Sequence, residues 1–181
     1  MFNYKIDEDT ELCLIMPRHA EELNALITQN YEHIKEWSAW LTDKERPIER
    51  TREWIKQNLI SFANNEGFTI GIWYKSALAG QIDFGNVDWN ARKFEIGYWL
   101  GESFQGKGLV TKSCRVLINH AFNELKFNRV EMRCAVENKK SRKIPEKLGF
   151  REEGLLRQAG RLHDYFVDEV IYGLLANEWQ N

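Results

Sequence analysis

Residues 94–136 restrict the fold of this chain most, because two alternating segments there enclose a glycine loop and an amphipathic helix. The first segment, FEIGYWL, alternates apolar residues with a period of two, and so does the second, VEMRCAV. Between them, after FQGKG, apolar residues recur at helical spacing. A strand, a helix and a second strand in this order predict a parallel crossover. The glycine loop then lies where the first strand meets the helix.

The rest of the chain shows helix and strand patterns without an internal repeat. A strand at 11–17 precedes a long helical pattern, which a break near Asn30 divides into two helices. A further helix begins at Pro47, a favoured first-turn residue. The remaining predicted elements are strands 68–74, 78–84, 151–158 and 165–175, and a short helix 138–150 that contains Pro145. Together with the crossover, these elements predict a mixed α/β fold.

The composition is that of one globular domain spanning residues 1–181. Hydrophobic residues make up 43% of the chain, which is enough for one sizeable core. The formal net charge of −2 argues against a protein that binds nucleic acid directly. No segment approaches the roughly 20 apolar residues of a membrane span, and the N-terminal residues do not resemble a signal peptide. We therefore expect a cytoplasmic protein without a membrane partner.

Three cysteines, Cys13, Cys114 and Cys134, do not have metal-ligand spacing. An odd number of cysteines in a chain of this kind is typical of small buried side chains in a reducing compartment. We therefore predict no metal site.

The glycine loop is compatible with several phosphate ligands. GESFQGKG has Gly101, Gly106 and Lys107 in register with a nucleoside-triphosphate loop. Gly108, however, stands where that loop needs the Ser or Thr hydroxyl that holds magnesium. The dinucleotide fingerprint also fails, because Thr111 replaces its third glycine. A turn that only begins a helix is the simplest alternative.

Gln105, Gly108 and Val110 fit a different loop better, Gln/Arg-x-x-Gly-x-Gly/Ala, although Val110 departs from its last position. With this loop the chain resembles the general N-acetyltransferase superfamily, which binds the diphosphate of coenzyme A there. Backbone N–H groups at a helix N-terminus can hold a diphosphate without a metal, and glycine lets the backbone approach it. The resemblance implies that acetyl-CoA is bound by Gln105, Gly106, Lys107, Gly108, Leu109 and Val110.

The order of elements also resembles that superfamily's fold along nearly the whole chain. The resemblance implies a mixed, mostly antiparallel seven-stranded sheet with a central splay, flanked by helices. The strands at 94–100 and 130–136 would splay apart, and the backbone of Trp99 and Leu100 would bond the pantetheine amides. NKKSRKIPEKLGF resembles the family's Asn-x-x-Ser/Ala helix, so Asn138 would complete the coenzyme site.

The motifs EIGYWL, QGKG, N-x-x-S and LGF-x-x-EG together resemble more closely the ribosomal-protein N-terminal acetyltransferases. That branch implies acetyl transfer from acetyl-CoA, as co-substrate and without a metal, to the α-amine of a protein, a ribosomal protein included. Two alternatives stay open. One is a small amine as acceptor, such as a polyamine, an amino sugar or an antibiotic, and the other is a non-catalytic acyl-CoA sensor. The sequence also leaves the oligomeric state open, a homodimer included.

The family acts by direct attack of an amine on the bound thioester, and the departing thiolate then needs a proton. Many members place a tyrosine seven residues after the Asn, where this chain has Pro145. The ribosomal-protein branch points to Ser141 as the donor instead. Cys134 falls in register with apolar residues, which fits a core position better than a covalent nucleophile.

The base that collects the proton of the amine is marked less clearly. The position at which the ribosomal-protein branch carries its catalytic carboxylate is Gly160 in this chain, so that carboxylate is missing. We take Glu95 as the catalytic candidate instead, and Asp83 as a candidate for the same role or for binding the acceptor. Trp37 and Trp40 are predicted to wall the acceptor site. An α-amine has a pKa of about 7.7–8.0, and a lysine at about 10.4 needs about 3.5 kcal/mol more to reach the same neutral fraction. A site without a strong base is therefore predicted to favour an α-amine.

Overall fold

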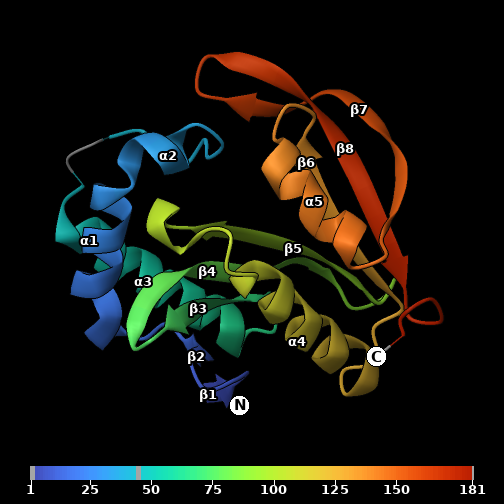
Figure 1. Cartoon of the computed structure of the whole chain (residues 1–181), viewed down its shortest axis with the longest axis horizontal. Helices are drawn as coiled ribbons and strands as arrows, with labels where there is room; N and C mark the ends of the chain where they lie inside the picture. Colours follow the sequence, from blue (N-terminus) through green and yellow to red (C-terminus); the bar gives the residue numbers. More distant parts are fainter. Residues whose placement is uncertain (1–2, 44–45, 181) are drawn as a thin grey trace.

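The computed structural model describes residues 3–43 and 46–180, which form one eight-stranded sheet with helices on both faces (Figure 1). The strand order is β1-β2-β3-β4-β5-β6-β8-β7. Only β5 and β6 pair in parallel, and every other neighbouring pair is antiparallel. The predicted crossover is thereby confirmed. The strands are β1 Asn3–Lys5, β2 Thr10–Leu14, β3 Phe68–Tyr74, β4 Ala77–Asp88, β5 Lys93–Leu100, β6 Arg129–Ala135, β7 Arg151–Leu162 and β8 Tyr165–Leu175.

The eighth strand corrects the prediction of seven. The additional strand is β1, a three-residue segment that pairs with β2 and whose side chains are all exposed. It has no apolar alternation, so the sequence pattern could not mark it. β4 and β7 also run further than predicted, to Asp88 and Leu162.

The helices cover the two faces of the sheet. α1 Ala20–Gln29 and α2 Tyr31–Lys35 are separated at Asn30, as predicted, and α3 Ile48–Ala63 follows directly after Pro47. Side chains of α1 and α3 pack with Trp73 and Leu78 on one face. α4 Leu109–Asn123 packs on the other face. α5 Lys139–Lys147 lies beside α4 (Figure 1). Within the described residues, no helix combines the length and the apolar character that crossing a membrane requires.

The parallel pair β5–β6 opens into a V, which confirms the predicted splay. The two strands pair only through Lys93–Arg129, Phe94–Val130 and Glu95–Glu131. The buried Glu131 carboxylate holds the closed end, since its Oε1 lies 2.7 Å from Arg129 Nε and 3.5 Å from Lys93 Nζ. Beyond this point, residues 96–100 of β5 have no partner on β6. Figure 1 shows β6, β7 and β8 turned away from the other half of the sheet.

Candidate active site

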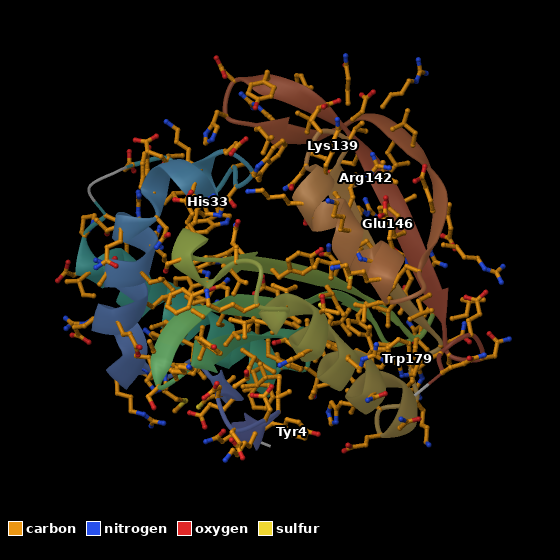
Figure 2. The ribbon with its side chains drawn as sticks, in the orientation of Figure 1. Tyr4, His33, Lys139, Arg142, Glu146 and Trp179 are labelled. Carbon is orange, nitrogen blue, oxygen red and sulfur yellow. The ribbon has the colours of Figure 1, made fainter. Side chains whose placement is uncertain are left out.

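The open end of the V leads into a cleft of about 860 Å³. Its walls come from α2 and the turn after it, β5, the glycine loop, the start of α4, β6, α5 and the β7–β8 hairpin. Figure 2 shows His33 of α2 and Lys139 of α5 on opposite sides of this cleft. His163 in the β7–β8 turn lies with its Nε2 2.9 Å from the Lys35 carbonyl oxygen, so the hairpin contacts the end of α2.

The glycine loop leads into the N-terminus of α4, whose free N–H groups can bind an anion. Gly106 and Gly108 have φ values of 77° and 74°, in the left-handed region that favours glycine, and Gly108 is the N-cap of α4. The first intrahelical bond runs from Lys112 N to Gly108 O, at 3.0 Å. The N–H groups of residues 109–111 precede it and have no backbone acceptor in the described chain. This end of α4 therefore fits a diphosphate, as the sequence predicts.

Gln105 and Lys107, both predicted to contact the coenzyme, have different surroundings. Gln105 bridges the two sides of the cleft, because its Nε2 lies 2.6 Å from His33 Nε2 and its Oε1 accepts from Lys140 Nζ at 3.4 Å. Lys107 folds back onto its own loop and donates to Ser103 O at 2.6 Å. It is not part of the cleft wall. The positive charge of the cleft wall on this side comes from four lysines of α5 that no sequence motif had marked: Lys139, Lys140, Lys143 and Lys147.

The unpaired part of β5 has room for an extended ligand. Trp99 and Leu100 lie in this part and line the cleft. Their backbone pairs with β4 on one side only, so the groups facing β6 are available to a ligand that lies along the strand edge. Leu109, Val110 and Asn138 also line the cleft, and the Asn138 side chain accepts from Ser141 N at 3.1 Å as the N-cap of α5.

Ser141 of α5 lies in a hydrogen-bonded cluster at the open end of the V. Its Oγ donates to the Tyr98 hydroxyl at 3.2 Å, and Cys134 Sγ lies 3.7 Å from the same Oγ. The Tyr98 hydroxyl in turn donates to the Ser141 carbonyl oxygen at 2.9 Å. Burial raises the pKa of Tyr98 well above its ordinary value, so this phenol stays protonated as a donor.

Pro145 explains why that carbonyl is free for Tyr98. In a regular helix the N–H of residue 145 would bond the carbonyl of residue 141, but proline has no N–H. The Tyr98 hydroxyl takes its place as the donor. In the sequence, Pro145 indicates only the loss of a tyrosine. The structure shows that the proline also couples Tyr98 of β5 to the helix that carries Ser141.

Glu95 and Asp83 lie outside the cleft wall. Glu95 Oε1 is 3.0 Å from Arg133 Nη2, and its Oε2 accepts from Asn86 Nδ2 at 2.9 Å. Asp83 lies in a second cavity of about 320 Å³, where Thr69 Oγ1 donates to it at 2.6 Å. Burial raises the pKa of Asp83 to about 6. Neither carboxylate is brought to the open end of the V.

The two tryptophans predicted to wall the acceptor site lie in different cavities. Trp37 lines the cleft, directly after α2. Trp40 lines the second cavity, with its ring centroid 6.5 Å from that of Trp99 and the Arg46 guanidinium 5.6 Å from its ring. Trp99 therefore stands between the cleft and the second cavity. Its Nε1 is buried and has no partner among the described residues.

Comparison with known proteins gives the family directly. Residues 11–151 match the family model described as an acetyltransferase (GNAT) domain. The chain belongs to the GNAT acetyltransferase family. It is an N-acetyltransferase, and acetyl-CoA is its acyl donor. The mixed α/β sheet flanked by helices is the fold of that family. Within the described residues, no cluster of side chains has the composition of a metal site.

Two relatives indicate the branch of the family, and one solved structure shows the fold with acetyl-CoA bound. YdaF of Bacillus subtilis, whose name gives ribosomal N-acetylation as a provisional assignment, is 38% identical, with 99% of this chain and 98% of that protein covered. The ribosomal-protein-serine acetyltransferase of Escherichia coli is 29% identical over 96% of both chains. The crystal structure of the microcin C7 self-immunity acetyltransferase MccE, with acetyl-CoA and AMP, is 33% identical, with a TM-score of 0.91 over 94% of both chains. This chain is similar to the ribosomal-protein acetyltransferase branch along nearly its whole length.

Proposed function

We propose that this enzyme acetylates the N-terminal α-amine of a protein, with a ribosomal protein as the first candidate. The similarity to the ribosomal-protein acetyltransferases supports this acceptor. The amine attacks the thioester directly, and the cluster around Ser141 stands ready to protonate the departing thiolate. In this scheme the residues 96–100 hold the pantetheine arm, and the N-terminus of α4 holds the diphosphate.

The charge of the cleft is the observation that favours a single amine over a polycation. A polyamine or aminoglycoside acceptor would need several carboxylates converging in the groove, and the segment around α2 offers Glu32, Glu36 and Asp43 for this role. Only Glu36 of these three lines the cleft. Asp43 is instead paired with Arg50, at 2.7 Å. The cleft wall carries more lysine and arginine than carboxylate side chains, which disfavours a polycationic acceptor.

The test compares three acceptors in a thioester-consumption assay with acetyl-CoA. The first is a short peptide with a free N-terminal serine, the second is the same peptide with a blocked N-terminus and one internal lysine, and the third is spermidine. At pH 7 an α-amine is neutral at least a hundredfold more often than a lysine amine. We expect kcat/KM to be at least tenfold higher for the free peptide. Faster transfer to the lysine peptide or to spermidine would refute the α-amine assignment.

A second candidate is the amine of a small molecule that carries a nucleotide. It rests on the 33% identity to MccE, which was solved with AMP bound. Trp37 in the cleft wall is a side chain on which a base could stack. Titration calorimetry of AMP into the enzyme saturated with acetyl-CoA separates the two candidates, because a peptide site has no reason to bind AMP.

A further inference from the structure

The space beside Gly160 is filled by a carboxylate from the neighbouring strand. A Cβ on Gly160 would lie only 2.6 Å from Glu169 Oε1 and 2.9 Å from Val167 Cγ2. The Gly160 backbone does not have a positive φ, so the backbone itself does not demand glycine. The absence of a side chain at position 160 is therefore what makes room for Glu169.

A bulge in β7 produces this arrangement. Leu156 lies opposite Glu169 and Gly160 lies opposite Val167, so three residues of β7, 157–159, face one residue of β8, Asp168. The Asp168 carboxylate fixes the bulge by accepting from Gln158 N at 2.8 Å. Extra residues in one strand bend it and re-aim the neighbouring side chains. Here the bulge brings Glu169 alongside Gly160 at the wall of the cleft.

Glu169 and Ser141 lie on opposite sides of the V. Side chains of a strand alternate between the two faces of its sheet. Cys134 of β6 points toward Ser141, so its neighbour Ala135 points to the other face. Glu169 is the register partner of Ala135 and shares that face. The same reasoning applies to β5, where Tyr98 bonds Ser141 and Trp99 points away from it. The thioester in the V would thus have a hydroxyl on one side and a carboxylate on the other.

The Glu169 carboxylate has no bonded partner among the described residues. Within residues 3–43 and 46–180, no hydrogen bond or ion pair engages it, although it lines the cleft and is half-buried. Glu169 pairs with Ala135, the neighbour of Cys134, and lines the cleft, so its charge lies close to the open end of the V. Burial raises the pKa of the Cys134 thiol, and the Glu169 charge adds to that rise. The cationic side chains of the same wall are occupied elsewhere: Arg133 pairs with Glu95, and the Arg161 guanidinium lies over the Phe166 ring. Glu36 is the charged group that lines the cleft at the end of α2.

We propose that Glu169 is the carboxylate that accepts the proton of the attacking amine, directly or through one water. It takes the place of the side chain that Gly160 lacks. The acceptor ammonium loses one proton to Glu169, and the neutral nitrogen attacks the thioester carbon. The N–C bond forms and the C–S bond breaks. The second N–H proton ends on the coenzyme A sulfur by way of the Ser141 side, and Glu169 releases its proton to solvent. This inference rests on acetyl transfer itself and not on which amine is the acceptor.

The experiment measures kcat/KM from pH 6 to pH 9 for the wild type and for Glu169→Gln. Both proteins are assayed with the free N-terminal serine peptide and with spermidine. The two proteins are then compared on the acceptor for which the wild type has the higher kcat/KM. We expect Glu169→Gln to lower kcat/KM tenfold to a hundredfold at pH 7, with the deficit shrinking toward pH 9 as the amine becomes neutral by itself. The dissociation constant of acetyl-CoA should stay within twofold of the wild type, because Glu169 lies on the acceptor side.

Two further variants distinguish a proton acceptor from a structural residue. Asp164→Asn alters an exposed carboxylate in the turn of the same hairpin, which does not line the cleft and does not hold the bulge, and should leave activity unchanged. The conservative variant Glu169→Asp keeps a carboxylate at this position and should recover at least a third of the lost activity at pH 7. Glu169→Gln activity within twofold of the wild type at every pH would overturn the proposal. An equal loss at every pH, unrelieved in Glu169→Asp, would also overturn it. If spermidine is the faster acceptor, the α-amine assignment fails, and the pH test of Glu169 is then read up to about pH 10.5, because an alkyl amine with a pKa of about 10.4 becomes neutral only there.

Discussion

Replacing Tyr98 by phenylalanine should test the link between β5 and the helix that carries Ser141. The substitution removes one hydroxyl and two hydrogen bonds, the 2.9 Å bond to the Ser141 carbonyl and the 3.2 Å bond from Ser141 Oγ. The Ser141 carbonyl then loses the donor that takes the place of the missing Pro145 N–H. Because this carbonyl is only partly buried, at the wall of the cleft, the loss should cost about 1 kcal/mol, the net value of one hydrogen bond. For a chain of this size the melting temperature should fall by about 2 to 4 °C.

Activity should fall as well, but by less than on removal of the serine. Ser141→Ala deletes the group that protonates the thiolate, and we expect kcat to drop tenfold to a hundredfold with acetyl-CoA affinity nearly unchanged. Tyr98→Phe keeps the Ser141 hydroxyl and only loosens its orientation. A loss of about fivefold in kcat corresponds to about 1 kcal/mol, the net value of one hydrogen bond.

Pro145→Ala provides the decisive control, because it restores the backbone N–H that a helix directs at the Ser141 carbonyl. In the wild type that carbonyl already accepts from Tyr98, so the new donor adds little. In Tyr98→Phe it fills the vacant acceptor and should recover about 1 kcal/mol. The loss of proline rigidity in the unfolded chain is common to both backgrounds and cancels in a double-mutant cycle. Urea unfolding of the four proteins gives the coupling energy, and a coupling below about 0.3 kcal/mol would refute the reasoning.

Two further predictions concern the coenzyme loop and the second cavity. Gly108→Asp should bind acetyl-CoA at least tenfold more weakly than Gly108→Asn in calorimetry. Both side chains tolerate the left-handed backbone of residue 108, and they differ only in the charge that faces the diphosphate. Equal affinities of the two variants would contradict a diphosphate at this end of the helix. Burial raises the pKa of Asp83 in the folded protein to about 6, so the wild type loses stability as pH rises from about 4 to 6. Asp83→Asn should therefore be more stable than the wild type by about 1 to 3 kcal/mol above pH 6, and not at pH 4. An unfolding free energy with the same pH dependence in both proteins would contradict this.

The coenzyme half of the site could be predicted from the sequence because it is local. The diphosphate loop needs glycines in a left-handed conformation directly before a helix, and Gly106 and Gly108 show that need in consecutive residues. The splay follows from the crossover, since a parallel pair joined by one helix is visible as two alternating segments around one periodic segment. In both cases neighbours in the sequence are also neighbours in space, so a pattern in the residues is enough.

The acceptor half could not be predicted because its contacts depend on register. Glu95 and Asp83 were chosen as carboxylates near the predicted cleft, yet β5 and β4 hold them at Arg133 and Thr69. Glu169 was passed over because a shift of strand pairing, the bulge opposite Asp168, decides whether it faces the cleft. Such a shift changes the face or position that each later side chain occupies and leaves little trace in composition.

Gly160 and Pro145 have one physical property in common. Each lacks a chemical group, a side chain or a backbone N–H, whose place is taken by a side chain from a neighbouring strand. Gly160 has no side chain, and the Glu169 carboxylate occupies the space where a Cβ would stand. Pro145 has no N–H, and the Tyr98 hydroxyl donates to the carbonyl that it leaves open. In the sequence both positions read as departures from the pattern of the family. Since a vacancy in a packed structure must be filled or satisfied, a departure of this kind indicates where to look for a substituting group, and the register of the sheet decides which residue supplies it.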